Sequence, residues 1–152
     1  MRNLLVILCV LLLSCTGNVV FQERAEIQDM AWAFDYPLSF DFQIQDTSLS
    51  YDMFLDIEHS RNFEYQNLYT GLRTISPSGD TTFQRFSIDL SDEFGQWLGT
   101  CKGNECSHQV LIKSASKYSG AGDYMIILDQ YSRSTVLQGI KSIGLTLALN
   151  ED

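Results

Sequence analysis

Apolar and polar residues alternate with a period of two through most of this chain, and this alternation constrains the fold more than any other feature. In 38–45 every second residue is apolar, beginning at Leu38 and ending with Ile44. The same spacing recurs in 51–58, where Tyr51 and Ile57 belong to one apolar face. A period of two is typical of half-buried β-strands. Further strands are predicted at 68–75, 81–90, 109–114, 124–131 and 143–149.

The segments between the predicted strands contain turn residues and no long stretch with helical periodicity. The Pro- and Gly-containing segments 76–80 and 119–123 are typical of turns, and 91–95 is expected to form a helical turn. Seven strands joined by polar turns predict an all-β fold, an antiparallel β-sandwich that is immunoglobulin-like or jelly-roll-like. Gly122-Asp123-Tyr124 resembles a tyrosine corner, which favours the immunoglobulin-like arrangement.

The first fifteen residues resemble a bacterial lipoprotein signal. Arg2 precedes ten apolar residues at 4–13, which are followed by Ser14-Cys15. This run is shorter than the roughly 20 residues that a membrane-spanning helix needs, so it indicates a secretory signal. Leu12-Leu13-Ser14-Cys15 resembles a lipobox, in which the cysteine is acylated and the bond before it is cleaved. We therefore predict a signal peptide at 1–14 and lipidation of Cys15; the alternative is an ordinary signal with a chance cysteine.

Beyond Cys15, the segment 16–36 lacks strict alternation and is expected to be a tether and irregular lead-in to one β-sandwich domain at 37–152. Removal of 14 of the 152 residues leaves 138, with 9 basic against 19 acidic residues and a net charge of −10. This acidic balance argues against a nucleic-acid partner. Residues 16–18 include no Asp, which by resemblance to bacterial sorting rules favours the outer membrane. No acidic run follows Cys15 either, which favours a domain that faces the periplasm.

Cys101 and Cys106 are the thiols that remain if Cys9 leaves with the signal and Cys15 carries lipid. An oxidising compartment and the Gly-containing loop between them favour a disulfide. Closing so short a loop would stabilise the fold by about 2 kcal/mol. Free thiols are one alternative, and zinc held by both cysteines and His108 is another. Structural zinc normally has four spaced ligands, so zinc is disfavoured.

No motif for catalysis or phosphate binding is present in the sequence, which contains no Gly-rich phosphate loop, His-Glu-x-x-His or Gly-x-Ser-x-Gly. His59 and His108 neighbour no recognisable nucleophile and are interpreted as loop or edge residues. Asp52, Asp56 and Glu58 share a strand face, where they are spread along the strand instead of converging. They are therefore more typical of a solvated face than of a calcium site or a pair of hydrolase carboxylates. No catalytic residue, metal or cofactor is predicted.

Several short motifs extend in order over nearly the whole chain. They are YDMFLDIE at 51–58, NFEYQNLY at 62–69, PSGDT at 77–81, GQWLG at 95–99, GDY at 122–124, LQGI at 137–140 and IGL at 143–145, with the lipobox and Trp32. In this order and spacing they resemble the gliding-motility lipoprotein GldH family of Bacteroidetes. Glu64 departs from a frequent Pro, and 101–106 departs from a Gly-rich stretch, so the resemblance implies no disulfide.

The resemblance implies an outer-membrane lipoprotein needed for gliding over surfaces and associated with the secretion and motility machinery. It carries over no enzymatic activity and no catalytic residue. The favoured hypothesis is therefore a non-enzymatic structural or assembly lipoprotein, held by acyl chains on Cys15, that docks other proteins of that machinery. The alternative is a glycan-binding surface lipoprotein with an exposed aromatic patch. A hydrolase is disfavoured because no acid, base and nucleophile are arranged for one.

Aromatic residues in or beside irregular segments are the candidate partner contacts, because large side chains with apolar and polar parts suit interface hot spots. Packing in the core or in loops is the alternative role for each of them. The selected residues are Trp32, Tyr65, Asn67, Tyr69 and Trp97.

Overall fold

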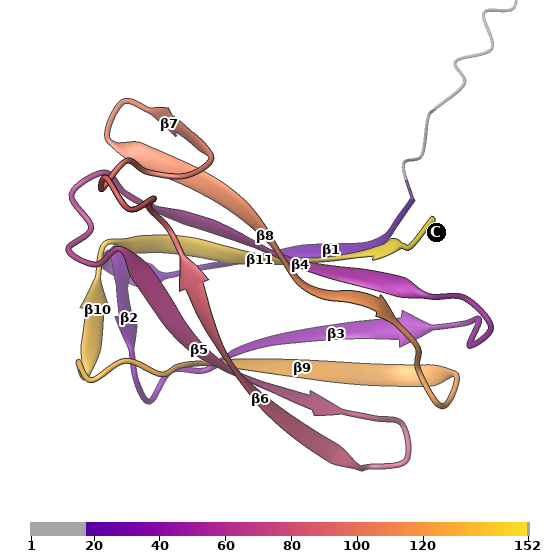
Figure 1. Ribbon diagram of the computed structural model, residues 1–152. Coiled ribbons are helices and arrows are strands. Elements are labelled where there is room, and N and C mark those ends of the chain that lie inside the picture. Colours follow the sequence, from indigo (N-terminus) through magenta and orange to yellow (C-terminus); the bar gives the residue numbers. More distant parts are fainter. Residues whose placement is uncertain (1–17, 152) are drawn as a thin grey trace, which may run out of the picture.

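The computed structural model describes residues 18–151, which form two facing β-sheets with a small third sheet at one end (Figure 1). In this range the elements are β1 (Val19–Glu26), η1 (Gln28–Met30), β2 (Ala31–Ala33), β3 (Leu38–Ile44), β4 (Tyr51–Ser60), β5 (Asn67–Ile75), β6 (Thr81–Asp89), β7 (Thr100–Lys102), β8 (Glu105–Ser116), β9 (Gly122–Gln130), β10 (Val136–Gln138) and β11 (Ile140–Leu149). The predicted signal peptide at 1–14 and lipidated Cys15 lie outside it. No helix within 18–151 is long and apolar enough to cross a membrane.

Eight long strands are divided equally between the two large sheets. The first, called the β4 sheet, has the order β1-β11-β4-β8 with the short β7 beside β8; the second, called the β5 sheet, has the order β3-β9-β5-β6. All of these pairings are antiparallel. Each sheet contains four long strands, and most strands that are neighbours in a sheet are distant in sequence. This arrangement is a jelly roll. The predicted all-β antiparallel sandwich is confirmed, with jelly-roll connectivity and not the immunoglobulin-like connectivity.

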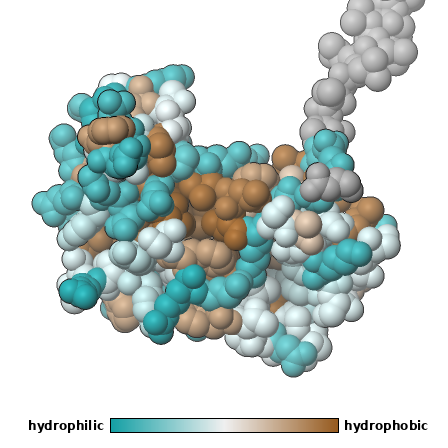
Figure 2. Space-filling model, viewed as in Figure 1, coloured by the Kyte–Doolittle hydropathy of each residue, from teal (hydrophilic) through white to brown (hydrophobic). Residues whose placement is uncertain are grey.

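The hydrophobic core lies between the inner faces of the two sheets, and Figure 2 shows apolar residues that reach the surface between them. Residues of β3 alternate between buried and exposed along the whole strand, and those of β4 alternate between buried and half-buried. Leu55 of β4, Ile126 of β9 and Leu145 of β11 have no exposed surface. Full burial of an aliphatic side chain of this size contributes about 1.5–3 kcal/mol. The alternation in the sequence therefore specifies which face of each strand enters the core.

The seven predicted strands correspond to β3, β4, β5, β6, β8, β9 and β11. The segment 16–36 differs from the expected irregular lead-in, since it includes β1, η1 and β2. β1 is an edge strand with no fully buried residue, so its sequence has no alternation to reveal it. Residues 91–95 form a hydrogen-bonded turn, closed by the amide of Gly95 donating to the carbonyl of Asp92, and no helix. The expected loop at 101–106 is a β7–β8 hairpin.

The expected tyrosine corner is present within this jelly roll. The hydroxyl of Tyr124 donates to the carbonyl oxygen of Gly120 at 2.8 Å, four residues upstream. That bond is the defining contact of a tyrosine corner. It fixes the turn before β9, but it does not by itself determine how the sheets are connected.

The sandwich has two distinct ends (Figure 1). At the N-terminal end, Val19 of β1 pairs with Ala148, which in turn pairs with Asp52. The turns 45–50, 76–80 and 117–121 lie at the same end. At the opposite end, called the hairpin end, lie the β7–β8 hairpin and the segments 61–66 and 131–135.

Candidate functional site

The outer face of the β4 sheet is polar, and the carboxylates of Asp56 and Glu58 have hydrogen-bond or ion-pair partners on adjacent strands. Asp56 accepts hydrogen bonds from Gln109 at 2.7 Å and Thr146 at 2.8 Å. Glu58 forms an ion pair with Arg24 at 3.2 Å. These carboxylates share one strand face, as predicted, and each bonds its own neighbours on adjacent strands. Within the described range, no group of three His, Cys, Asp or Glu residues is placed to hold a metal ion.

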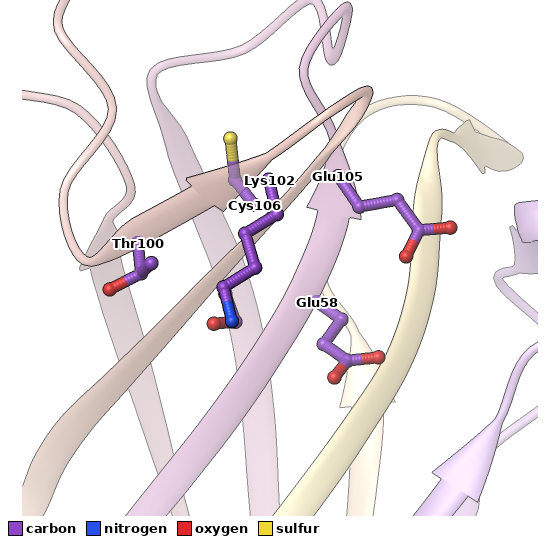
Figure 3. Close-up of a pocket in the computed structure, with 6 residues that line it drawn as sticks. Glu58, Thr100, Lys102, Glu105 and Cys106 are labelled. Atoms are coloured by element: carbon purple, nitrogen blue, oxygen red, sulfur yellow. The ribbon is translucent and has the colours of Figure 1, made fainter.

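A pocket of about 450 Å³ lies against the β7–β8 hairpin, lined in part by Glu58, Lys102 and Glu105 (Figure 3). The ammonium of Lys141 lies 2.6 Å from the Glu105 carboxylate and 3.8 Å from that of Glu58. The hydrogen bond to Glu105, with the nearby carboxylate charges, raises the pKa of Lys141. Both carboxylates at this pocket therefore already have a cationic partner, and they stabilise the sheet locally.

The outer face of the β5 sheet is aromatic by contrast. Tyr69 of β5 is 48% exposed, Phe83 of β6 is 47% exposed, and Tyr131, directly after β9, is 39% exposed. Arg85 of β6 places its guanidinium carbon 4.4 Å from the ring centre of Tyr131 and 5.8 Å from that of Phe83. Together with Tyr65, these four residues are called the aromatic face.

Gly71 of β5 leaves room for the rings of Phe83 and Tyr131 to lie close against the backbone of the strand. A Cβ atom at this position would lie 2.8 Å from the Phe83 ring and 3.3 Å from the Tyr131 ring. The ring centres of Phe83 and Tyr131 are 6.1 Å apart. Rings at such separations, with an arginine stacked over one of them, form a rigid surface that combines apolar area with positive charge.

A pocket of about 440 Å³ opens beside the aromatic face at the hairpin end. Its lining includes Tyr65, Asn67, Tyr69, Tyr131 and Arg133. The Asn67 amide donates to the Tyr69 hydroxyl at 3.1 Å, and this bond orients the phenol. The hydroxyls of Tyr65 and Ser134 are 3.2 Å apart. Exposed rings and hydrogen-bonding groups thus converge at one site, which suits the recognition of an external ligand or protein.

Three of the five predicted contact residues, Tyr65, Asn67 and Tyr69, are brought together at this pocket. Trp32 is not part of it, because its side chain is 0% exposed in the core and its Nε1 donates to the Tyr36 carbonyl at 2.9 Å. As a core residue, Trp32 offers no contact surface. Trp97 is half-buried, and its Nε1 donates to the Arg61 carbonyl at 3.1 Å.

Sequence patterns alone missed Phe83, Arg85, Tyr131 and Arg133. A usable signal lies in the predicted strand 81–90, where Phe86, Ile88 and Leu90 stand at every second position and give one apolar face. The odd-numbered residues of that strand must then point outward, and they include Phe83 and Arg85. Their pairing with Tyr131 across Gly71 could not be inferred, because it depends on β5 lying between β6 and β9.

His59 lies under Trp97 and is completely buried. The two ring centres are 4.6 Å apart, and the ring of Phe63 lies 5.8 Å from His59. Its Nδ1 is 2.9 Å from the Ser60 carbonyl oxygen, whereas Nε2 has no hydrogen-bond partner within 18–151. Burial lowers the pKa of His59, and the charge of His108 lowers it further. Burial also lowers the pKa of His108.

We expect the stability of the domain to decrease as the pH falls below about 6.5, the ordinary pKa of histidine. Both histidines have folded-state pKa values below that of the unfolded chain. The neutral histidines therefore contribute fully to the free energy of unfolding at pH values above the pKa of the unfolded chain. This contribution is lost as the pH falls through the lowered pKa values of the folded state. Urea unfolding at pH 7.5, 6.5 and 5.5 measures this. An unchanged free energy of unfolding across the three pH values would contradict it.

Cys101 and Cys106 occupy paired positions on β7 and β8 and are joined by a disulfide, with their Cα atoms 4.0 Å apart. Cys106 is buried, whereas Cys101 is half-buried. The disulfide closes the hairpin at the end of the sandwich where the pocket of the aromatic face opens.

These features define a jelly-roll β-sandwich protein with one polar outer face and one aromatic outer face suited to docking. The family model described as "GldH lipoprotein" matches residues 19–147, and the chain belongs to this family. A curated relative from Christiangramia forsetii, "Gliding motility lipoprotein GldH homolog", is 23% identical over 150 residues, or 94% of this chain and 91% of its own. Another, "Gliding motility lipoprotein GldH" of Flavobacterium johnsoniae, is 23% identical over 152 residues, or 95% and 94%.

Among solved structures, the chain also aligns with "Structure of infectious bursal disease virus Gx strain". This alignment covers 87% of the present chain and 30% of the other, with 11% identity and a TM-score of 0.31. A TM-score of this size is too low to establish a shared fold.

Proposed function

We propose that this protein is a membrane-anchored lipoprotein of the gliding motility machinery, with a non-enzymatic structural or assembly role. Membership of the GldH lipoprotein family and the names of the two relatives support the motility assignment. The proposed anchor is an acylated Cys15 in the outer membrane, with the domain facing the periplasm. Two or more acyl chains on one residue provide stable anchoring.

The observation that carries the docking role is the position of the aromatic pocket. It lies at the hairpin end, whereas β1 begins at the N-terminal end. An anchor on Cys15 would hold the N-terminal end toward the bilayer. The pocket formed by Tyr65, Asn67 and Tyr69 would then face away from the membrane, where other proteins of the machinery can reach it.

The composition of the aromatic face fits a protein partner. Tyrosine and arginine are among the residue types enriched at the energetic centres of protein interfaces. Tyr69 and Tyr131 each offer a large, rigid surface with a polar end, so little conformational entropy is lost when a partner binds. On the opposite face Glu58 forms an ion pair with Arg24, and Asp56 is hydrogen-bonded by Gln109 and Thr146, so these carboxylates are less available to a partner.

The test is crosslinking in intact cells, followed by identification of the proteins attached to wild type and to Tyr69→Ala and Tyr131→Ala variants. Each variant is expected to weaken partner binding by about 2 kcal/mol or more, roughly thirtyfold, as is typical of a hot-spot aromatic residue. Both side chains are exposed, so the fold should be retained, which circular dichroism checks.

The matched control is Leu111→Ala, which removes an exposed apolar side chain of β8 in the β4 sheet, away from the aromatic face on the β5 sheet. Partner recovery should be the same with Leu111→Ala as with wild type. If both tyrosine variants remain folded and retain the full set of partners, the aromatic face is not the docking surface.

A glycan is the second candidate ligand, favoured specifically by the pocket in which Tyr65 and Tyr69 flank Asn67. Aromatic rings stack on sugar rings, and amide and hydroxyl groups hydrogen-bond sugar hydroxyls. This function requires the domain to be on the outside of the cell. Proteolysis of intact cells distinguishes the protein partner from the glycan. A domain that is protected from the protease cannot bind external glycans, whereas a domain that is cleaved contradicts the periplasmic placement.

A further inference from the structure

A second pocket, of about 360 Å³, lies at the N-terminal end and is called the lysine pocket. Lys113 of β8 and Lys117, which follows β8, line it together with hydroxyl side chains from three strands, Thr74 of β5, Thr82 of β6 and Ser116 of β8. One carboxylate, that of Asp80, also lines the pocket and accepts a hydrogen bond from Ser78 at 2.7 Å. The pocket thus gathers two cations in a chain with a net charge of −9.

Lys113 differs from the other partly covered cations of the domain. Arg24 and Arg73 each form an ion pair with a carboxylate, and Lys141 contacts two. The half-buried Lys113 forms no ion pair or hydrogen bond through its ammonium within residues 18–151. The nearby carboxylate of Asp52 is instead bound by Ser114, the Ala115 amide and Asn150. Lys113 therefore has a positive charge available for a ligand.

The hydroxyl groups of the pocket provide a second, independent observation. The Thr74 hydroxyl is buried and has no hydrogen-bond partner among the residues described. Buried polar atoms without partners are uncommon, because the hydrogen bonds that such an atom loses with water are then not replaced. Thr74 pairs directly with Thr82 in the β5–β6 register, so two hydroxyl-bearing residues lie side by side at this pocket. Hydroxyl donors and an unpaired ammonium together are the chemistry that binds an oxyanion.

We propose that the lysine pocket binds a phosphate group, and that in the anchored protein this phosphate belongs to a phospholipid headgroup. Lys113 and Lys117 supply the charge, and the Thr74 and Thr82 hydroxyls donate to the phosphate oxygens. Cys15 precedes Val19 by four residues, which span at most about 14 Å when extended. The N-terminal end is therefore within reach of the headgroups of any bilayer that holds Cys15. The assignment of the phosphate to a lipid rests on the proposed anchoring. The affinity of the pocket for phosphate does not depend on that anchoring.

The first arm of the test titrates inorganic phosphate into the protein, purified in an uncharged detergent, and follows binding by calorimetry. Lys113→Gln is expected to weaken binding about tenfold or more, since it removes a charged donor. Asp80→Asn is expected to tighten binding several-fold, because it removes the one carboxylate from the pocket. Lys102→Gln, at the hairpin end, is the matched control and should have no effect. Absence of saturable binding, or equal effects of Lys113→Gln and Lys102→Gln, would overturn the site.

The second arm identifies the source of the phosphate without any variant. The wild-type protein is reconstituted in vesicles of phosphatidylcholine with and without phosphatidylglycerol, and lysine acetylation is mapped by mass spectrometry. Protection of Lys113 and Lys117, relative to Lys102, supports a lipid headgroup. If inorganic phosphate binds in the first arm but neither vesicle protects these lysines, the lipid assignment is wrong and the pocket binds soluble phosphate. If the protein fails to associate with vesicles at all, the proposed anchoring fails independently of the pocket.

Discussion

Replacement of Trp32 by alanine is expected to destabilise the domain by about 3–5 kcal/mol, the range measured when large aromatic side chains are removed from protein cores. Trp32 has no exposed surface, and it pairs with Leu137 across the small β2–β10 sheet. The substitution removes this packing and leaves the Tyr36 carbonyl without its indole donor. Equilibrium urea unfolding, monitored by circular dichroism, measures the loss.

Tyr69→Ala provides the comparison, because it removes an aromatic side chain that is exposed on the surface. We expect its effect on the free energy of unfolding to be about 0.5 kcal/mol or less. A loss of partner binding in cells carrying Trp32→Ala would then reflect a lower amount of folded protein. A Trp32→Ala protein as stable as Tyr69→Ala would show that Trp32 does not belong to the core.

Replacement of Gly99 by alanine is expected to be about as damaging, with a loss of about 3 kcal/mol or more. Gly99 has a φ of +76°, and a Cβ atom there would lie 2.1 Å from the Ser107 carbonyl oxygen and 2.9 Å from the His108 Cα. These atoms belong to the backbone of β8 and cannot rotate away. The penalty combines the left-handed conformation, about 1–2 kcal/mol, with an overpacking cost of about 1–3 kcal/mol.

Gly103→Ala, in the turn of the β7–β8 hairpin that Gly99 directly precedes, is the matched control. Gly103 also has a positive φ, of +59°, but a Cβ atom there would meet nothing within 4 Å. Its substitution should therefore cost only the conformational term, about 1–2 kcal/mol. Thermal unfolding of both variants, compared with wild type, separates the steric term from the conformational one. Equal losses of stability in the two variants would mean that Gly99 does not lie in tight contact with the backbone of β8.

The strands of the core were predictable because the period of two is a local property of the chain. In β3, Leu38, Phe40 and Phe42 are buried, and the residues between them are exposed. β1 was not predictable, since its position at the sheet edge leaves no residue fully buried, and its pairing with β11 brings together residues more than 100 positions apart. The three-residue strands β2, β7 and β10 are too short to show any period.

The candidate site was predictable only in part, for the same reason. Tyr65, Asn67 and Tyr69 are close in sequence, so a single segment places all three at the pocket. Phe83 and Tyr131 come from other segments and meet only because β5 lies between β6 and β9 and carries Gly71. Trp32 resembled a contact residue by its type, and only the packed structure shows that it is buried.

The sequence by itself determined which residues form most of the strands, which face of each strand is apolar and to which family the chain belongs. Those properties depend on residue order along the chain, and alternation at a period of two is sufficient to assign the faces. The tertiary structure alone decided between jelly-roll and immunoglobulin-like connectivity, and it alone separated the buried Trp32 from the exposed Tyr69. Strand adjacency and burial depend on contacts between distant segments, and an exposed aromatic residue and a buried one look alike in a sequence.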